Sequence, residues 1–384
     1  MRSRRFAGAL LALTLVTAAC GGDDDTADSA PETTAADSAP ETTAAEPAPE
    51  TTMGDENMHP DWPEKLVFGF VPSQEQETLQ DDIQPFIEVL QEGLGIEVEG
   101  VVTTDYTGLV TAMGADQADL GAFGPFGYVL GKDNFGNIEA LIQSIRFGSA
   151  TYHGQWMTND DSICDEPPVE GTALENSADG LVQVPATEAV ALQVGVFFGD
   201  DGAQLGETTD DGTAISPGYS CIGDLSKVAG KTVAWVGETS TSGYVFPALQ
   251  LKNLGIDPTT GVQGSFTGGH DAAVTAVYNG DAEIGVSFDD ARRTIRGTNP
   301  DVGAKNIVFN LTPEVPNDVV AVRSDLPQDL KDAIYDTVAA YVATEEGQAI
   351  FDEIYGWTDV RRANEADFDV VRTAANELGI TEPL

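Results

Sequence analysis

The chain has 384 residues, 41% of them hydrophobic, and it carries 64 Asp and Glu against 18 Lys and Arg, a formal net charge of −46. This length allows two domains of ordinary size, each with its own core. The acidic excess argues against nucleic acid and anionic membrane surfaces as partners.

Residues 1–20 have the pattern of an export signal. Three arginines within the first five residues precede an apolar run at 6–16, which is too short to span a membrane as a helix. Small residues then lead to Cys20, which resembles the lipidated first residue of a bacterial lipoprotein, although Thr17 replaces the usual larger apolar residue. We expect an exported chain, anchored through Cys20 at the outer face of the cytoplasmic membrane. Plain secretion is the alternative.

Residues 21–64 form a low-complexity segment with 13 acidic residues and no Lys or Arg. The nonapeptide DSAPETTAA occurs at 28–36 and again at 37–45, and EPAPETT follows. Low hydrophobicity, proline and charge of one sign cannot offset the chain entropy that is lost on folding. We therefore expect a disordered acidic tether between the membrane and the folded body.

From residue 65 onward, strand-like and helix-like runs alternate, which is the pattern of an α/β fold. Residues 66–71 predict a strand, apolar side chains at helical spacing in 83–94 predict a helix, and 96–102 predict a second strand. The body therefore begins with a strand–helix–strand unit.

Cys164 and Cys221 bracket a segment rich in Gly, Asp, Pro and Thr. In an exported chain, two remaining cysteines favour a disulfide, so residues 164–221 predict a stapled, loop-like insertion. A zinc site is the weaker interpretation, because His59, His153 and His270 lie far from both cysteines in sequence.

The body contains one internal repeat. Residues 65–71 resemble 231–237, residues 85–98 resemble 247–258, and residues 110–123 resemble 274–287 at a constant offset of 164. Three similar pieces in one order predict two lobes of like topology, with a ligand in the cleft between them. At this offset Tyr106 corresponds to His270 and Pro125 to Asp289, so these four residues are expected to face the cleft from opposite sides.

The second copy contains the anion site that the sequence predicts. Ser240, Thr241 and Ser242 directly precede Gly243 and a helix-like run, and no Lys or Arg accompanies them. Side-chain hydroxyls and free backbone N–H groups at a helix start favour an anion. The alternative is that these residues only cap the helix.

Four segments together resemble the phosphate, phosphite and phosphonate substrate-binding proteins of ABC importers. The segments are TSTSGY at 239–244, TDYTGLVTA at 104–112, GPFGYV at 124–129 and GHDAAVTAVYNGDAEIGVSFDDA at 269–291. The resemblance covers residues 66–351, except for the insertion. It implies a two-lobed periplasmic-binding-protein fold of the second type. Lobe one would comprise 66–155 and 313–384, and lobe two 156–312.

The resemblance also implies residue roles. Ser240, Thr241 and Ser242 would hold phosphonate oxygens, and Tyr106, Tyr152 and His270 would donate further hydrogen bonds. Asp289 or Asp290 would face the substituent on phosphorus and pair with an ammonium group, which favours 2-aminoethylphosphonate over phosphite or a simple alkylphosphonate. The alternative is that both acids cap the next helix. The expected partners of this monomer are a permease and an ATPase.

Two other functions remain open. A binder of another small ligand, such as a sulfonate or a vitamin precursor, would use the same fold. A surface-anchored hydrolase is disfavoured because Ser242 lacks the GxSxG elbow, and because metal motifs such as HExxH or CxxC are absent. We therefore expect no catalytic residue, no metal and no cofactor.

Overall fold

The computed structural model describes residues 59–146, 148–185, 197–198, 204–205, 208–209 and 211–382. The expected signal, Cys20 and the tether up to residue 58 lie outside the described residues. Trp62 belongs to the folded body, because it packs against the core and its indole donates to Asp329 over 3.0 Å. No helix in the described ranges combines the length and apolarity needed to cross a bilayer.

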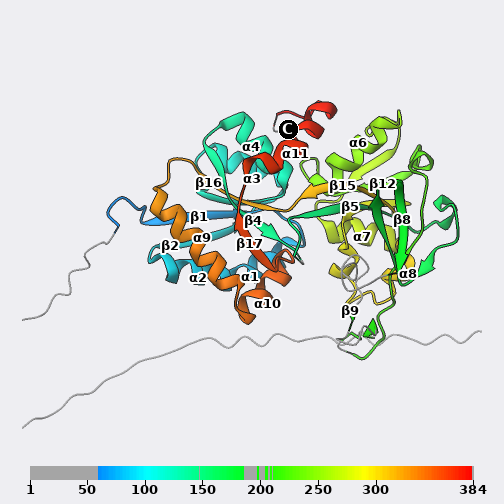
Figure 1. The fold of residues 1–384 in the computed structure, drawn as a ribbon, viewed down its shortest axis with the longest axis horizontal. Coiled ribbons are helices and arrows are strands. Elements are labelled where there is room, and N and C mark those ends of the chain that lie inside the picture. The colour runs from blue at the N-terminus through cyan, green and yellow to red at the C-terminus, as the bar shows by residue number, and fades with distance from the viewer. Residues whose placement is uncertain are drawn as a thin grey trace, which may run out of the picture. The chain divides into compact units, whose positions relative to one another are not determined.

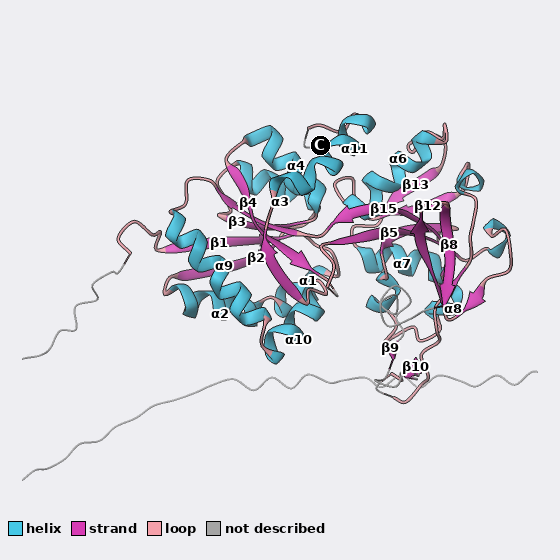
Figure 2. Ribbon diagram, in the orientation of Figure 1, coloured by secondary structure: helices cyan, strands magenta, loops and turns pink. Residues whose placement is uncertain are grey.

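The first sheet is a mixed sheet that carries helices on both faces (Figures 1 and 2). Parallel pairing joins its strands β1, β2 and β3, whereas β16 runs antiparallel to β3 and β4. In spatial order the strands are β17 (Asp359–Arg362), β4 (Ile138–Ile145), β16 (Val319–Arg323), β3 (Leu120–Phe123), β1 (Lys65–Phe70) and β2 (Glu97–Val102). The helices are α1 (Gln76–Asp82), α2 (Gln84–Leu94), α3 (Tyr106–Gly114), α4 (Pro125–Phe135), α9 (Gln328–Val342), α10 (Glu345–Ile354) and α11 (Asp369–Leu378).

The second sheet repeats the parallel core of the first. Its strands in spatial order are β13 (Gln263–Phe266), β12 (Thr232–Trp235), β14 (Ile284–Phe288), β5 (Thr151–Thr158), β15 (Ile307–Pro316), β11 (Tyr219–Ser220) and β6 (Val169–Glu170). The helices α6 (Phe246–Asn253), α7 (His270–Asn279) and α8 (Val302–Lys305) accompany it. We call the parts built on the first and second sheets lobe one and lobe two.

The chain crosses between the lobes twice. It leaves β4 at residue 145 to enter β5, and it leaves β15 at residue 316 to enter β16. The expected limits of 155/156 and 312/313 fall inside β5 and β15, which both belong to the second sheet. Sequence periodicity identifies a strand but does not say which sheet it joins, and this explains the difference. Both lobes belong to one compact unit.

The internal repeat is visible in the fold. β1, α2, β2, α3 and β3 correspond in order to β12, α6, β13, α7 and β14, and β1 and β12 each pair in parallel with two strands. Helices α3 and α7 begin at Tyr106 and His270, at the predicted offset. The predicted apolar stripe of α2 is buried through Phe86, Ile87, Leu90 and Leu94.

Cys164 and Cys221 are joined by a disulfide that closes a loop with a sequence separation of 57 residues. The bracketed segment is less loop-like than the sequence suggested. It contains a hairpin formed by β7 (Thr172–Ser177) and β8 (Gly180–Pro185), and a pairing of β9 (Phe197–Phe198) with β10 (Gln204–Leu205). Gly180, with φ of 118°, directly follows the two turn residues 178–179 and begins β8 at a conformation that suits glycine.

Replacing both cysteines by serine is expected to lower the free energy of unfolding by about 2–4 kcal/mol, because a loop of this length no longer restricts the unfolded chain. Urea unfolding of the oxidised wild type and of the double variant measures the difference. Wild-type protein treated with a reductant is the control and should match the variant. Equal midpoints for variant and oxidised wild type would contradict the expectation.

Candidate ligand-binding site

A cavity of about 550 Å³ lies between the lobes, beyond the carboxyl ends of β3, β12 and β14. Six of the eight residues expected at the ligand line it: Tyr106, Tyr152, Ser240, Thr241, Ser242 and His270. Among the described residues, no group of His, Cys, Asp or Glu could hold a metal ion.

Helix starts from both lobes meet at this cavity. Lobe one contributes the first residue of α3 and the start of α4, and lobe two contributes the first residue of α7 and a single π-turn, η3 (Thr241–Val245), that leads into α6. Unpaired N–H groups and the positive ends of the helix dipoles lie at such starts. The converging starts therefore favour an anion in the cavity.

Each hydroxyl of the Ser240–Thr241–Ser242 cradle already accepts one hydrogen bond. Ser240 Oγ accepts from the N–H of Gly243 over 3.2 Å, and Thr241 Oγ1 accepts from the N–H of Phe126 over 2.9 Å. Ser242 Oγ accepts from the Tyr152 hydroxyl over 3.3 Å. A hydroxyl has one proton to donate, and none of the three donates it to an acceptor in the described part of the chain. Three O–H donors are therefore available to a ligand.

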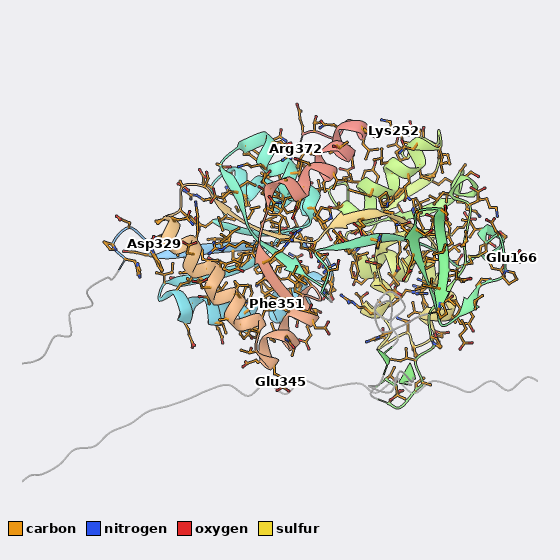
Figure 3. All side chains as sticks on the ribbon, in the orientation of Figure 1. Glu166, Lys252, Asp329, Glu345, Phe351 and Arg372 are labelled. Carbon is orange, nitrogen blue, oxygen red and sulfur yellow. A yellow bond between two sulfur atoms is a disulfide. The ribbon has the colours of Figure 1, made fainter. Side chains whose placement is uncertain are left out.

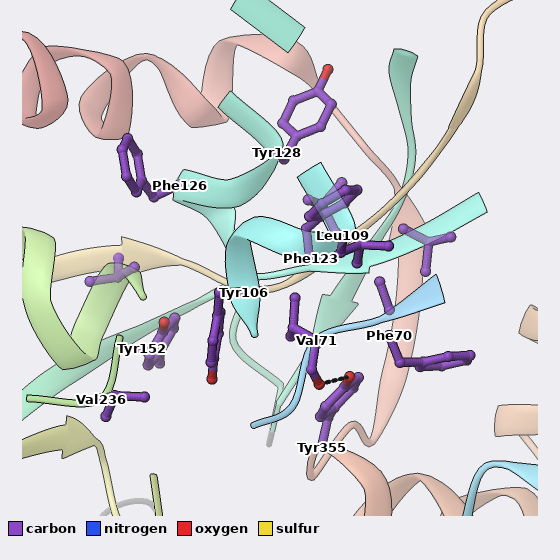
Figure 4. Packing of buried hydrophobic residues seen from close by; sticks show 14 of the residues in the cluster. Phe70, Val71, Tyr106, Leu109, Phe123, Phe126, Tyr128, Tyr152, Val236 and Tyr355 are labelled. Carbon is purple, nitrogen blue, oxygen red and sulfur yellow. Dashed lines mark hydrogen bonds between the residues drawn. The ribbon is translucent and has the colours of Figure 1, made fainter. Parts of the chain in front are cut away.

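Tyr106 and Tyr152 provide the aromatic wall of the cavity, and Figure 4 shows the Tyr106 ring between Tyr152 and Val71. They are 7% and 8% exposed. Burial, followed by the negative charge of Asp318, raises the pKa of both phenols well above 10. Both phenols therefore keep their protons at neutral pH. The buried Tyr106 hydroxyl lies close to Ser240 but forms no hydrogen bond of normal geometry with a described residue, so it is a fourth potential donor.

His270 is buried beside the cradle and is neutral at physiological pH. Burial and, secondarily, the positive charge of Arg146 lower its pKa from 6.5 to about 3. Its Nδ1 lies 2.7 Å from Ser287 Oγ, which fixes the ring against β14. A neutral imidazole can donate one N–H to an anion without binding a proton from solvent.

The His270→Gln variant is expected to lose part of the acid sensitivity of the fold. An unfolded histidine binds a proton near pH 6.5, whereas folded His270 does so only near pH 3. As the pH is lowered from about 6.5 to about 3, His270 therefore lowers the wild-type free energy of unfolding by up to about 1.4 kcal/mol per pH unit. Above pH 6.5 His270 has no such effect. Urea unfolding from pH 7.5 to 4 measures this slope. An unchanged slope in His270→Gln would contradict the pKa assignment.

Asp289 and Asp290 lie outside the cavity, which corrects the expectation that one of them faces the ligand. Phe288, at the end of β14, lines the cavity instead. Asp289 pairs with His153 and accepts from its N–H over 3.1 Å. Asp290 caps the short helix η4 (Ala291–Thr294), the role that the alternative interpretation gave it. Phe288 is the last residue of β14, and the chain turns at Asp289, whose carboxylate is held against His153 and not in the cavity.

Arginines line the cavity, whereas the sequence suggested a cradle with no cationic side chain. Arg146 and Arg293 lie in the wall, together with Asp318. Arg146 Nη2 lies 2.6 Å from Asp318 Oδ2, which also accepts from the Trp357 indole over 3.2 Å. Arg146 and Asp318 are 172 residues apart and come from the two crossovers, so their positions in the sequence do not predict that they form an ion pair. The one feature that could have drawn attention to Arg146 is that it closely precedes Tyr152, a residue already assigned to the site.

Contacts between the lobes surround the site. The N–H of Phe126 in lobe one donates to Thr241 in lobe two, and the N–H of His270 in lobe two donates to the carbonyl of Ser73 over 3.0 Å. Helix α11 contacts both lobes. Its Arg372 pairs with Asp133 of α4 over 2.8 Å, and its Glu377 carbonyl accepts from Lys252 of α6. Figure 3 labels Arg372 and Lys252.

Curated relatives are binding proteins. The Mycolicibacterium smegmatis phosphate-import protein PhnD is 26% identical over 235 residues, which are 59% of this chain and 56% of that protein. The chain thus spans little more than half the length of that relative. The Escherichia coli phosphonates-binding periplasmic protein is 21% identical over 319 residues, which are 83% of this chain and 78% of that protein.

Solved structures share the two-lobed α/β fold that the sequence predicted. A binding protein component of an ABC phosphonate transporter from Pseudomonas aeruginosa has a TM-score of 0.61 at 17% identity, over 84% of this chain and 88% of its own. PhnD1 of Prochlorococcus marinus, in complex with methylphosphonate, has a TM-score of 0.60 at 16% identity, over 83% of this chain and 99% of its own. The model of the periplasmic substrate-binding proteins of phosphonate ABC transporters matches residues 68–368. The chain belongs to this family, whose members are binding proteins and not enzymes.

Proposed function

We propose that this chain is the extracytoplasmic solute-binding component of an ABC importer and that it binds a tetrahedral phosphorus oxyanion in the cavity between its lobes. The observation that supports this most directly is the Ser240–Thr241–Ser242 cradle, in which every hydroxyl accepts from the protein and keeps its own proton for a ligand. A phosphate-type group presents several acceptor oxygens and matches such a set of donors.

The energetics are sufficient without a direct guanidinium clamp. A hydrogen bond to a charged group contributes about 1.5–3 kcal/mol, so the three cradle hydroxyls and Tyr106 together contribute about 6–12 kcal/mol, a range that includes micromolar binding. The acidic surface has little influence on the ligand, because exposed charges are screened over about 8 Å at physiological salt.

The preference for 2-aminoethylphosphonate has lost its original support. It depended on a carboxylate of Asp289 or Asp290 in the cavity, and both are bonded elsewhere. Asp318 is a carboxylate of the cavity wall, and it is already paired with Arg146. We therefore propose the class of phosphate, phosphite and phosphonates as ligand, without an ammonium-bearing member in first place.

Calorimetry tests the proposal with phosphate, phosphite, methylphosphonate and 2-aminoethylphosphonate. We expect stoichiometric binding of at least one of them, with no turnover after prolonged incubation. Methanesulfonate is the matched control, because it is also tetrahedral but carries a single negative charge. Tighter binding of the sulfonate, no binding of any phosphorus compound below millimolar concentration, or release of a product would refute the proposal.

The proposed anchor and partners complete this role. We propose that the mature chain begins at a lipid-modified Cys20 and delivers its ligand, as a monomer, to a permease driven by a separate ATPase. Mass spectrometry of protein from the membrane fraction should find the lipid on Cys20. A soluble mature form that begins elsewhere would contradict the anchor and leave the ligand proposal untouched.

A further inference from the structure

The cavity has a second, cationic region beyond the hydroxyl cradle. Two guanidinium groups lie at the ring of Phe288, with their Cζ atoms 5.7 Å from its centroid for Arg146 and 5.4 Å for Arg293. The Arg146 guanidinium also lies 5.3 Å from the centroid of the Tyr152 ring, whose hydroxyl bonds the cradle. Tyr152 and Phe288 thus connect the cradle to Arg293.

Arg293 differs from Arg146 in forming no direct ion pair with a described residue. Asp318 neutralises Arg146 at 2.6 Å, whereas the Arg293 guanidinium makes no ion pair or side-chain hydrogen bond with any described residue. Burial and the neighbouring Arg146 lower the pKa of Arg293, while the negative charges of Asp352, Asp290 and Asp289 oppose this shift without pairing directly with the guanidinium. Asp82, Asp352 and Glu353 also line the cavity, and none of them forms an ion pair with Arg293; Asp352 and Glu353 are exposed to solvent. The Arg293 guanidinium therefore lies in the cavity wall without a direct ion pair.

The position of Arg293 is set by both lobes. It extends from η4 of lobe two, and its Nη2 approaches Gly356 of lobe one so closely that a Cβ there would lie 2.2 Å away. Gly356 also has φ of 69°, a conformation that favours glycine, so both the backbone and the contact with Arg293 disfavour a side chain at this position. The arginine lies against the backbone of the opposite lobe, within the cavity wall.

The cavity is larger than a small oxyanion requires. At about 550 Å³ it falls within the range of sites for drug-sized ligands, whereas methylphosphonate has only five heavy atoms. Space therefore remains for a substituent that extends from the cradle towards Arg293. A planar guanidinium binds a carboxylate through two parallel N–H···O bonds.

We propose that the cavity selects phosphorus oxyanions whose substituent carries a second anionic group, a carboxylate, with the phosphoryl end in the hydroxyl cradle and the carboxylate on Arg293. This inference rests on the proposed function and adds a class of substrate to it. An ammonium-bearing substituent is disfavoured, because it would meet an unpaired cation.

Three ligands of equal length test the proposal by calorimetry: 3-phosphonopropionate, its carboxamide, and 3-aminopropylphosphonate. We expect the carboxylate to bind roughly 10- to 100-fold more tightly than the amide, as one charge-assisted pair predicts, and the amine to bind most weakly. Methylphosphonate reports on the cradle alone. The Arg293→Gln variant should bring the carboxylate-to-amide ratio close to 1, and Arg293→Lys should restore part of it.

Arg362→Gln is the matched control, because it removes one arginine that pairs with Asp332 on the surface of lobe one, and it should keep the wild-type ratio. Thermal unfolding confirms that each variant is folded. An equal affinity for carboxylate and amide, or tightest binding of the amine, would overturn the inference while methylphosphonate binding still supports the proposed function. Equal weakening of all ligands in Arg293→Gln would instead place Arg293 on the phosphoryl group. If no phosphorus compound binds the folded protein, the proposed function fails together with the inference.

Discussion

Replacing Asp290 by Ala is expected to lower the free energy of unfolding by about 3–5 kcal/mol. Asp290 and Arg292 are 0% and 2% exposed, and they are joined by bonds of 2.9 Å and 2.7 Å from Nε and Nη2 to one carboxylate oxygen. The carboxylate also accepts from Gln155 over 2.7 Å. Its removal deprives the buried guanidinium of this carboxylate, while the carbonyls of Gly303 and Asn306 still accept from it.

Urea unfolding measures the effect, and Asp325→Ala provides the control, because Asp325 pairs with Arg323 while 66% exposed. Such exposed pairs contribute roughly 0–1 kcal/mol. Adding Arg292→Met to Asp290→Ala should recover much of the lost stability, since a buried pair can be replaced by apolar side chains. A loss of stability below 1 kcal/mol in Asp290→Ala would contradict the stabilising role assigned to the buried ion pair.

Asp290→Asn should also leave the ratio of affinities for aminoethyl- and ethylphosphonate unchanged, because this side chain lies outside the cavity.

Replacing Ser242 by Ala is expected to weaken the binding of the best phosphorus ligand by about 1.5–3 kcal/mol, through the loss of one hydrogen bond to a charged oxygen. Ser242→Asp should have a larger effect. Two negative charges about 4 Å apart repel each other by roughly 4 kcal/mol at an effective dielectric constant near 20, which corresponds to about a thousandfold in affinity.

Ser242→Asn is the matched control for Ser242→Asp, because the two side chains have the same shape and differ in charge. Calorimetry with phosphate and methylphosphonate measures all three variants, after thermal unfolding has shown that they are folded. Similar affinities for the Asn and Asp variants would contradict an anion at Ser242. No change in the Ala variant would leave Ser242 with a structural role only, as the acceptor for Tyr152.

The sequence predicted the parts of the site that depend on local pattern. The 164-residue repeat predicted that helices begin at Tyr106 and at His270. Both residues line one cavity, because each helix follows the carboxyl end of a strand that faces the cavity. The hydroxyl cradle was equally predictable, because Ser240 to Gly243 are consecutive residues before a helix. Such features need only the periodicity of helices and strands.

The remaining site residues depend on tertiary structure. Asp289 was expected in the cavity, but β14 ends at Phe288, which lines the cavity, and the sequence does not show which way the following turn points its side chains. Arg146 and Asp318 meet only because the two crossovers lie side by side, and Arg293 reaches the cavity through its contact with Gly356 of the other lobe. No local pattern contains these relationships.

Under the proposed function, the hydrogen bond from the N–H of Phe126 to Thr241 couples ligand binding to the contact between the lobes. The Thr241 oxygen that accepts from lobe one would also donate to the proposed anion, and each bond would polarise the hydroxyl in favour of the other. A bound anion would then favour molecules in which this contact is made, and those molecules would hold the anion more tightly by the same factor. Breaking the contact would remove the acceptor bond of Thr241 and lower the affinity for the anion.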